Sequence, residues 1–151
     1  MPADKMNRDQ IDALLNRAYY ARLSTMGEKY PYTVPLCYLY HEGKLYFHSR
    51  LTGKKMSELT AKPEVCLQID EIKDLITSSS PCDFNVAYES VIVQGTTAVI
   101  DDFGAKGEIL LLLAQKYAKG QPLDQMEVDS IKGTALVQVN IETISGKAKK
   151  A

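Results

Sequence analysis

Alternation of apolar and polar residues predicts six β-strands in this chain. The clearest example is the final one, where Val137, Val139 and Ile141 alternate with polar neighbours. The predicted strands are Tyr20–Met26, Tyr32–Tyr40, Lys44–Ser49, Glu64–Ile72, Val86–Asp101 and Ala135–Ile144. Because short turns join most consecutive strands, the pattern favours a mainly β fold, a six-stranded antiparallel barrel with peripheral helices, over a doubly wound sheet.

Two of these strands contain residues that interrupt regular pairing. Pro35 lies in the middle of Tyr32–Tyr40 and cannot donate to a strand ladder, so this strand is predicted to be an edge or to be bulged there. Gly95 lies inside Val86–Asp101 and predicts a bulge or a sharp bend. The sequence His41-Glu42-Gly43 predicts a tight turn that returns the chain as a hairpin.

Helical periodicity predicts three helices. Asn7 and Gln10 form a capping-box pattern before a first apolar stripe, and Lys54–Ala61 is predicted as a short helix that ends before Pro63. Asp101 or Asp102 is predicted to cap the third helix, which ends near Ala118 and is apolar on almost every side. Such a helix is usually buried on more than one face, which indicates an oligomer.

The remaining segments are predicted to be irregular. Lys73–Asp83 contains the run SSSPCD and is predicted to be a loop. The C-terminal residues GKAKKA are expected to form a basic, mobile tail. No repeat or linker divides the chain, so residues 1–151 are expected to form a single domain.

Composition narrows the function classes. A net charge of −1 argues against general nucleic-acid binding, which depends on excess Lys and Arg. The longest apolar run, Ile109–Ala114, is too short to cross a bilayer, and the N-terminus has no apolar signal core. The three cysteines lack metal-type spacing, so free thiols in a reducing cytoplasm are expected.

The stretch Leu45–Ser57, LYFHSRLTGKKMS, carries the main candidate chemistry. It places Lys54 and Lys55 in the first turn of a predicted helix, where cations oppose the helix dipole. Free N–H groups at a helix start attract anions, and a bound phosphate would make both features favourable. The sequence therefore predicts a seat for a phosphorylated ligand, with two solvated surface lysines as the open alternative.

His48 follows an apolar strand and has two interpretations. Its ring could lie beside a bound planar ligand or donate a proton to a substrate, or it could be a hydrogen-bonded histidine at a barrel rim. His41 lies in a turn and is expected to be solvated, and no carboxylate or cysteine completes a metal-ligand set with the two histidines. The nucleophile elbow, the dinucleotide fingerprint and the P-loop are all absent from the sequence.

Several stretches, in their order and spacing, resemble a known family. They are ARLSTMG (21–27), YTVPLCYLY (32–40), GKLYFHSRLTGKKMSEL (43–59), PEVCLQID (63–70) and YESVIVQGTTAVI (88–100). The chain resembles the FMN-binding split-barrel proteins related to pyridoxamine 5′-phosphate oxidase, in the branch of the nitroimidazole-resistance (Nim-like) flavoproteins. The resemblance covers most of the chain, from the first predicted helix to the last predicted strand.

This resemblance implies a homodimer of six-stranded split barrels with FMN in grooves between the subunits. Carried over by motif, it gives roles to ten residues: Lys54 and Lys55 at the phosphate; Phe47, His48 and Ser49 along the ribityl chain and ring; Leu36 and Cys37 as backbone contacts; and Tyr88, Ser90 and Val91 closing the site from the partner subunit.

The chain departs from the oxidases at one point. They use a C-terminal Trp-x-Arg element, whereas this chain has no Trp and ends in GKAKKA. The resemblance therefore implies an FMN-dependent oxidoreductase that passes electrons from NAD(P)H to a small molecule such as a nitroaromatic compound, and does not imply oxidation of the vitamin. His48 is the candidate for tuning the flavin or donating a proton. The alternative is a non-catalytic split-barrel module that binds a flavin or haem.

Overall fold

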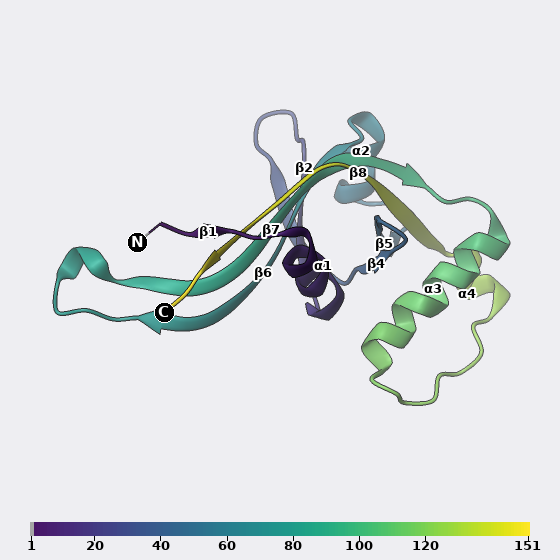
Figure 1. The fold of residues 1–151 in the computed structure, drawn as a ribbon. Coiled ribbons are helices and arrows are strands. Elements are labelled where there is room, and N and C mark those ends of the chain that lie inside the picture. The colour runs from purple at the N-terminus through teal and green to yellow at the C-terminus, as the bar shows by residue number, and fades with distance from the viewer. Residues whose placement is uncertain (1) are drawn as a thin grey trace.

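Antiparallel β-structure dominates the computed structural model, which describes residues 2–151 (Figure 1). The elements are β1 (Asp4–Lys5), α1 (Arg8–Arg17), β2 (Ala21–Thr25), β3 (Tyr32–Leu36), β4 (Leu39–His41), β5 (Lys44–Arg50), α2 (Lys54–Ala61), β6 (Glu64–Ile76), the 3₁₀ turn η1 (Pro81–Asp83), β7 (Asn85–Val99), α3 (Phe103–Ala118), α4 (Val128–Lys132) and β8 (Thr134–Lys149). The predicted fold class, a mainly β barrel-like fold with peripheral helices, is confirmed.

The strand order explains how the sheet becomes a split barrel. Neighbours in the sheet follow the order β3-β2-β6-β7-β8-β5-β4, and β1 pairs with β8. The two end strands, β3 and β4, are consecutive in the chain and are separated only by Cys37 and Tyr38. The predicted strand Tyr32–Tyr40 is thus divided in two, and it joins opposite ends of the sheet. This division and the short β1 account for eight strands where the pattern predicted six.

The core lies on the inner face of the barrel. Leu23 on β2 is opposite Leu67 on β6, which is opposite Val93 on β7, and all three side chains are fully buried. Leu14 and Leu15 of α1 pack into the same cluster. Since successive residues of a strand point to opposite faces, this row fixes which residues of each strand face outward.

A second, smaller cluster places α3 and α4 against the outside of β5 and β8. Leu110 of α3 and Ile131 of α4 pack on Tyr46 and Leu136. Phe47, the next residue of β5, is fully buried in the main core. The side chain of His48 therefore follows Tyr46 onto the outer face that α3 and α4 partly cover.

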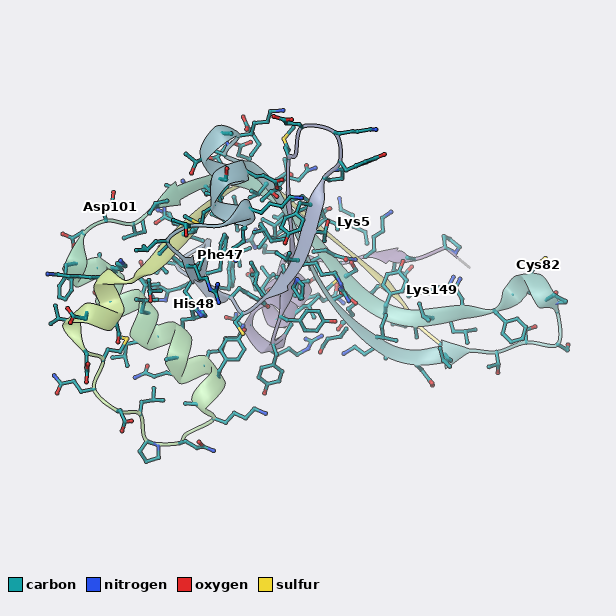
Figure 2. All side chains as sticks on the ribbon, turned by 180° about the vertical axis from the view of Figure 1, so that it is seen from behind. Lys5, Phe47, His48, Cys82, Asp101 and Lys149 are labelled. Atoms are coloured by element: carbon teal, nitrogen blue, oxygen red, sulfur yellow. The ribbon has the colours of Figure 1, made fainter. Side chains whose placement is uncertain are left out.

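A long arm of β6, β7 and β8 extends beyond the barrel, and its tip carries Cys82 (Figures 1 and 2). Two predictions about this region are wrong. The predicted loop Lys73–Asp83 begins as strand, because β6 continues to Ile76 and pairs with β7. The predicted mobile tail is also largely strand, because residues 146–149 of β8 pair with β7, as in Ser90 opposite Lys147.

The predicted irregularities are present. Gly95 lies at a register shift where β8 holds one extra residue, and a Cβ at Gly95 would lie 2.1 Å from the Asn140 carbonyl oxygen. Pro35 lies on β3, an edge strand that pairs only with β2. Glu42 and Gly43 have φ angles of 50° and 74°, as expected for the two central residues of a type I′ hairpin turn.

The helix boundaries follow local signals closely. The capping box of Asn7 and Gln10 is present at α1, α2 has the predicted bounds, and Asp102 caps α3 by accepting from the Ala105 N–H. The short helix α4 was not predicted. Within residues 2–151, none of the helices has the length and apolar character that a membrane span requires.

Candidate functional site

The first turn of α2 is positively charged and has no side-chain cap. Its N-cap residue is Gly53, with φ at 123°, a backbone conformation that side chains rarely adopt. Glycine has no side chain to accept from the first N–H groups of the helix, so these groups remain available to an anion. Lys54 and Lys55 follow immediately. The geometry therefore fits the predicted phosphate seat.

The two lysines differ in their surroundings. Lys54 is exposed, and its Nζ lies 4.4 Å from the centroid of the Tyr32 ring on β3. Lys55 is partly buried, with its Nζ 5.8 Å from the centroid of the Phe47 ring, and burial lowers its pKa. A bound dianion would offset the desolvation of the Lys55 ammonium group.

Three predicted contact residues lie together on β5, and they face different ways. Phe47 is fully buried in the core, so its side chain does not face outward. His48 is exposed and Ser49 is half-buried. Figure 2 shows Phe47 and His48 on the barrel side of the molecule, opposite the arm that carries Cys82.

A cavity of about 310 Å³ lies between the barrel and the helices α3 and α4. Cys37 and His48 both line it, although Cys37 lies between β3 and β4 and His48 lies on β5. The other lining residues are mostly apolar: Leu110, Leu113, Ala114, Tyr117, Met126, Ser130 and Thr134. The structure thus brings two of the predicted site residues together in one pocket that is open to solvent.

Leu36 ends the edge strand β3, and Cys37 is the exposed residue that follows it. Because β3 pairs with β2 alone, its other edge has no strand neighbour among residues 2–151. Backbone groups at such an edge can contact a ligand. This arrangement fits the predicted backbone contacts of Leu36 and Cys37.

Tyr88 and Ser90 line a separate groove of about 350 Å³ on the outer face of β7 and β8. The groove also contains Ile92, Gln94, Thr143, Ser145, Gly146 and Lys147. Gln68 of β6 donates to the Ser90 hydroxyl at 3.3 Å. Val91, the neighbour of Ser90, is fully buried on the inner face, so its side chain does not reach the groove.

No cavity found in residues 2–151 contains all the predicted site residues. Lys54 lines a third space of about 490 Å³, together with Met26–Tyr30 and the outer side of α2. His48 lies on β5, the strand that precedes the start of α2 at Lys54, whereas Tyr88 and Ser90 lie in a groove of their own.

Sequence reasoning missed two residues of α3 at this site. Tyr117 lines the cavity beside Cys37, and its hydroxyl oxygen accepts from the Tyr38 N–H at 3.0 Å. Lys116 donates to the Tyr38 carbonyl oxygen at 3.0 Å. Tyr117 belonged to the apolar stripe of the predicted helix, but no local pattern indicates a bond across 79 positions of the chain.

Comparison with known structures shows the same fold in several proteins. The flavocytochrome from Azotobacter vinelandii has a TM-score of 0.86 at 21% identity, over 96% of this chain and 68% of its own. The FAD and heme binding protein from Mycobacterium smegmatis has a TM-score of 0.88 at 18% identity, over 96% and 72%. A candidate 5-nitroimidazole antibiotic resistance protein from Bacteroides thetaiotaomicron has a TM-score of 0.83 at 19% identity, over 97% and 89%.

Comparison by sequence identifies the family. No match was found among curated proteins. A family profile described as pyridoxamine 5′-phosphate oxidase matches residues 7–148. The match covers almost the whole chain and agrees with the resemblance that the sequence motifs indicated, and we conclude that the protein belongs to the pyridoxamine 5′-phosphate oxidase family.

Proposed function

We propose that this protein binds a flavin, specifically FMN, and passes electrons from NAD(P)H to a small molecule such as a nitroaromatic compound. The observation that carries the proposal is the uncapped start of α2 with Lys54 and Lys55, next to the end of the strand that holds His48. The structural neighbours include a flavocytochrome, proteins that bind FAD or FAD and heme, and a candidate 5-nitroimidazole resistance protein, which supports a flavin-type ligand.

The residues present fit a phosphorylated flavin. Lys54, Lys55 and the first N–H groups of α2 would hold the phosphate, because charge-assisted bonds to phosphate are the strong ones. The backbone of Leu36 and Cys37 would contact the ring, with His48 and Ser49 beside the ring and the ribityl chain. The bound flavin supplies the redox chemistry, while this chain binds it, orients it and excludes water.

We propose further that two copies of the chain form the site together. Tyr88 and Ser90 lie in a groove separate from the cavity of Cys37 and His48, so a partner subunit would have to bring such a groove to the flavin. In a single copy, Leu111 of α3 is 40% exposed and Leu75 of the arm is 69% exposed. A dimer interface would bury apolar area of this kind.

His48 would act on the flavin or the substrate rather than on the phosphate. Its side chain is exposed at the wall of the mostly apolar cavity, where a planar ligand could lie against it. An imidazole in this position could donate a proton to a reduced substrate.

A titration with FMN tests the cofactor assignment. The double variant Lys54→Ala with Lys55→Ala is expected to weaken FMN binding at least about tenfold, because two charge-assisted contacts are lost. Lys29→Ala with Lys62→Ala is the matched control, since both lysines line the cavity beside α2 but lie away from its first turn. If the Lys54 and Lys55 double variant keeps the wild-type affinity, the phosphate seat is refuted.

Turnover separates the enzyme from a binding module. Flavin-loaded protein is mixed with NADH or NADPH, with and without a nitroimidazole, and the loss of the nicotinamide absorbance is measured. Faster consumption in the presence of the nitro compound supports the oxidoreductase. Absence of consumption under both conditions favours the alternative, a split barrel that binds a flavin or heme without catalysing its reduction.

A further inference from the structure

Between β3 and β4 the chain leaves the sheet. The backbone polar groups of this segment therefore need hydrogen-bond partners from other elements. Tyr38 pairs with no strand, yet its side chain is fully buried, and its hydroxyl donates to the Leu15 carbonyl oxygen at 2.6 Å. A buried backbone N–H or C=O without a partner costs about 1–3 kcal/mol. Both of these groups of Tyr38 find their partners in the last turn of α3.

Tyr117 connects three segments through one hydroxyl group. It accepts from the Tyr38 N–H at 3.0 Å and donates to the Tyr19 carbonyl oxygen at 2.5 Å. Tyr19 lies just before β2, so the same hydroxyl bridges α3, the start of β2 and the segment between β3 and β4. Burial raises the pKa of Tyr117 to about 12, and the hydroxyl therefore remains protonated at physiological pH.

Lys116 binds the other backbone polar group of Tyr38, its carbonyl. Its Nζ donates to the Tyr38 carbonyl oxygen at 3.0 Å and lies 3.6 Å from the centroid of the Tyr38 ring. A lysine in the last turn of a helix is commonly solvated, where it complements the helix dipole. Lys116 is instead partly buried against the ring, and burial lowers its pKa to about 8.

These contacts lie directly beside the proposed flavin site. Cys37, the neighbour of Tyr38, lines the cavity with His48, and Tyr117 lines the same cavity. The last turn of α3 thus forms one wall of the cavity and also fixes the backbone that the flavin ring would contact. We propose that Lys116 and Tyr117 form a latch: they are positioning residues that hold the Cys37–Tyr38 backbone against the bound flavin, and release of the latch frees the cofactor.

This latch rests on the proposed function, and its two states differ in the environment of the Lys116 amine. In the released state the amine is solvated and has its ordinary pKa of 10.5, whereas burial lowers the pKa to about 8 in the latched state. The Lys116 amine therefore loses its proton at a lower pH in the latched state than in the released state. Raising the pH above about 8 favours latching, by at most about tenfold per pH unit up to the ordinary pKa.

The groups that face Lys116 come from each element around it. Negative charge on Cys37 raises the pKa of Lys116, against the effect of burial. The rings of Tyr38 and Tyr117 face the amine, and the pKa of each is raised chiefly by burial, so both stay neutral below pH 9. Glu71 and Arg17 act on the Tyr38 hydroxyl, at the far end of its ring.

Hydrogen exchange of the Tyr38 amide tests the latch without any cofactor. In wild-type protein, the protection factor of this amide is expected to rise about tenfold between pH 6.5 and 9.0, because release becomes rarer. Lys116→Met removes the titrating amine but keeps an apolar chain of similar length, and the rise should vanish. Lys116→Arg stays charged and should also show no rise. The same measurements in Cys37→Ser protein show whether the Cys37 thiol contributes to the pH dependence.

The rate of FMN dissociation tests the link to the cofactor. If the flavin leaves through the released state, its dissociation from wild-type protein slows by up to about tenfold over the same pH range, and neither Lys116 variant shows this slowing. FMN dissociation that changes with pH equally in all three proteins overturns the latch. A Tyr38 amide that exchanges equally in wild type and Lys116→Met, at both pH values, overturns it independently.

The outcomes also separate the latch from the proposed function. Wild-type protein that binds no FMN at any pH refutes the proposed cofactor, and with it the role of the latch in holding that cofactor. Wild-type protein that binds FMN, with identical dissociation rates in the Lys116 variants, refutes the latch alone and leaves the flavin assignment intact.

Discussion

Glu71 and Glu89 lie directly opposite each other on β6 and β7, at the base of the arm. Like charges at opposed positions of two strands destabilise a sheet. Here Arg17 of α1 bonds both carboxylates, with its Nε 2.7 Å from Glu71 Oε1, and Lys73 Nζ lies 3.1 Å from Glu71 and 3.3 Å from Glu89. Two cations thus neutralise the pair and anchor the arm to α1.

Arg17→Met is expected to lower the free energy of unfolding by about 0.5–1 kcal/mol at pH 7, since the ion pairs are partly exposed. Burial raises the pKa of Glu71, but hydrogen bonds from Arg17 and Lys73 outweigh it and the pKa is lowered. A lowered carboxyl pKa gives stability that is present above its ordinary value of 4.5 and is lost as the pH falls through the folded value.

Urea unfolding at pH 7 and at about pH 3 checks this prediction, because the difference between wild type and Arg17→Met should shrink in acid. Arg8→Met is the control, since Arg8 pairs with Asp12 one turn away and donates to the Tyr40 hydroxyl, but makes no ion pair with the carboxylates of the arm. A difference of the same size at both pH values would show that Arg17 stabilises the arm by packing rather than by charge.

Tyr117→Phe removes one hydroxyl and leaves the Tyr38 N–H and the Tyr19 carbonyl without their partner. We expect the free energy of unfolding to fall by about 1–3 kcal/mol, because the partly buried Tyr38 N–H loses its hydrogen bond. Thermal and denaturant unfolding measure the change. Tyr30→Phe is the matched control, because Tyr30 is 71% exposed, and it should change stability little.

Gly95→Ala places a methyl group 2.1 Å from the Asn140 carbonyl oxygen, so the bulge between β7 and β8 must open. The expected loss of stability is about 1–3 kcal/mol or more. Gly107→Ala, within α3, is the control with room for a methyl group, because its Cβ would meet nothing closer than 3.5 Å. That change should stabilise the protein by about 0.5–1 kcal/mol, through helix propensity. Equal effects of the two substitutions would contradict the tight approach at Gly95.

The arm exposes an apolar patch that the proposed dimer would cover. A bulge at Lys73 puts Leu75 on the same face as Ile72, and these side chains are 69% and 59% exposed. Ile72→Ser with Leu75→Ser is expected to weaken association, with the molar mass falling from twice 16.8 kDa towards 16.8 kDa in light scattering. Leu123→Ser, at an exposed position outside the arm, should leave the mass of the dimer unchanged.

Local sequence signals predicted several elements well. The capping box at Asn7, the bounds of α2 and the turn at Glu42 and Gly43 all match the structure. Each depends on interactions within a few residues, such as a side chain that caps the next turn or a glycine that adopts a positive φ. The edge position of Pro35 follows equally from chemistry carried by one residue.

Longer-range features were predicted less well. The pattern treated Tyr32–Tyr40 as one strand, because its alternation continues through Cys37 and Tyr38. The structure divides it, since β3 pairs with β2 while β4 pairs with β5 at the other end of the sheet. The pattern also ended β6 and β8 too early, because polar residues of the arm become strand only through their partners on β7.

The sequence by itself determined the uncapped, positively charged start of α2 at Lys54 and Lys55, because a strand end, a glycine and a helix start are contiguous in the chain. Only the tertiary structure decided which residues surround it. Cys37, His48 and Tyr117 meet at one cavity because the barrel closes and α3 packs across its split. The contacts of Lys116 and Tyr117 with Tyr38 join residues 78 and 79 positions apart, and such pairings depend on packing that no local pattern encodes.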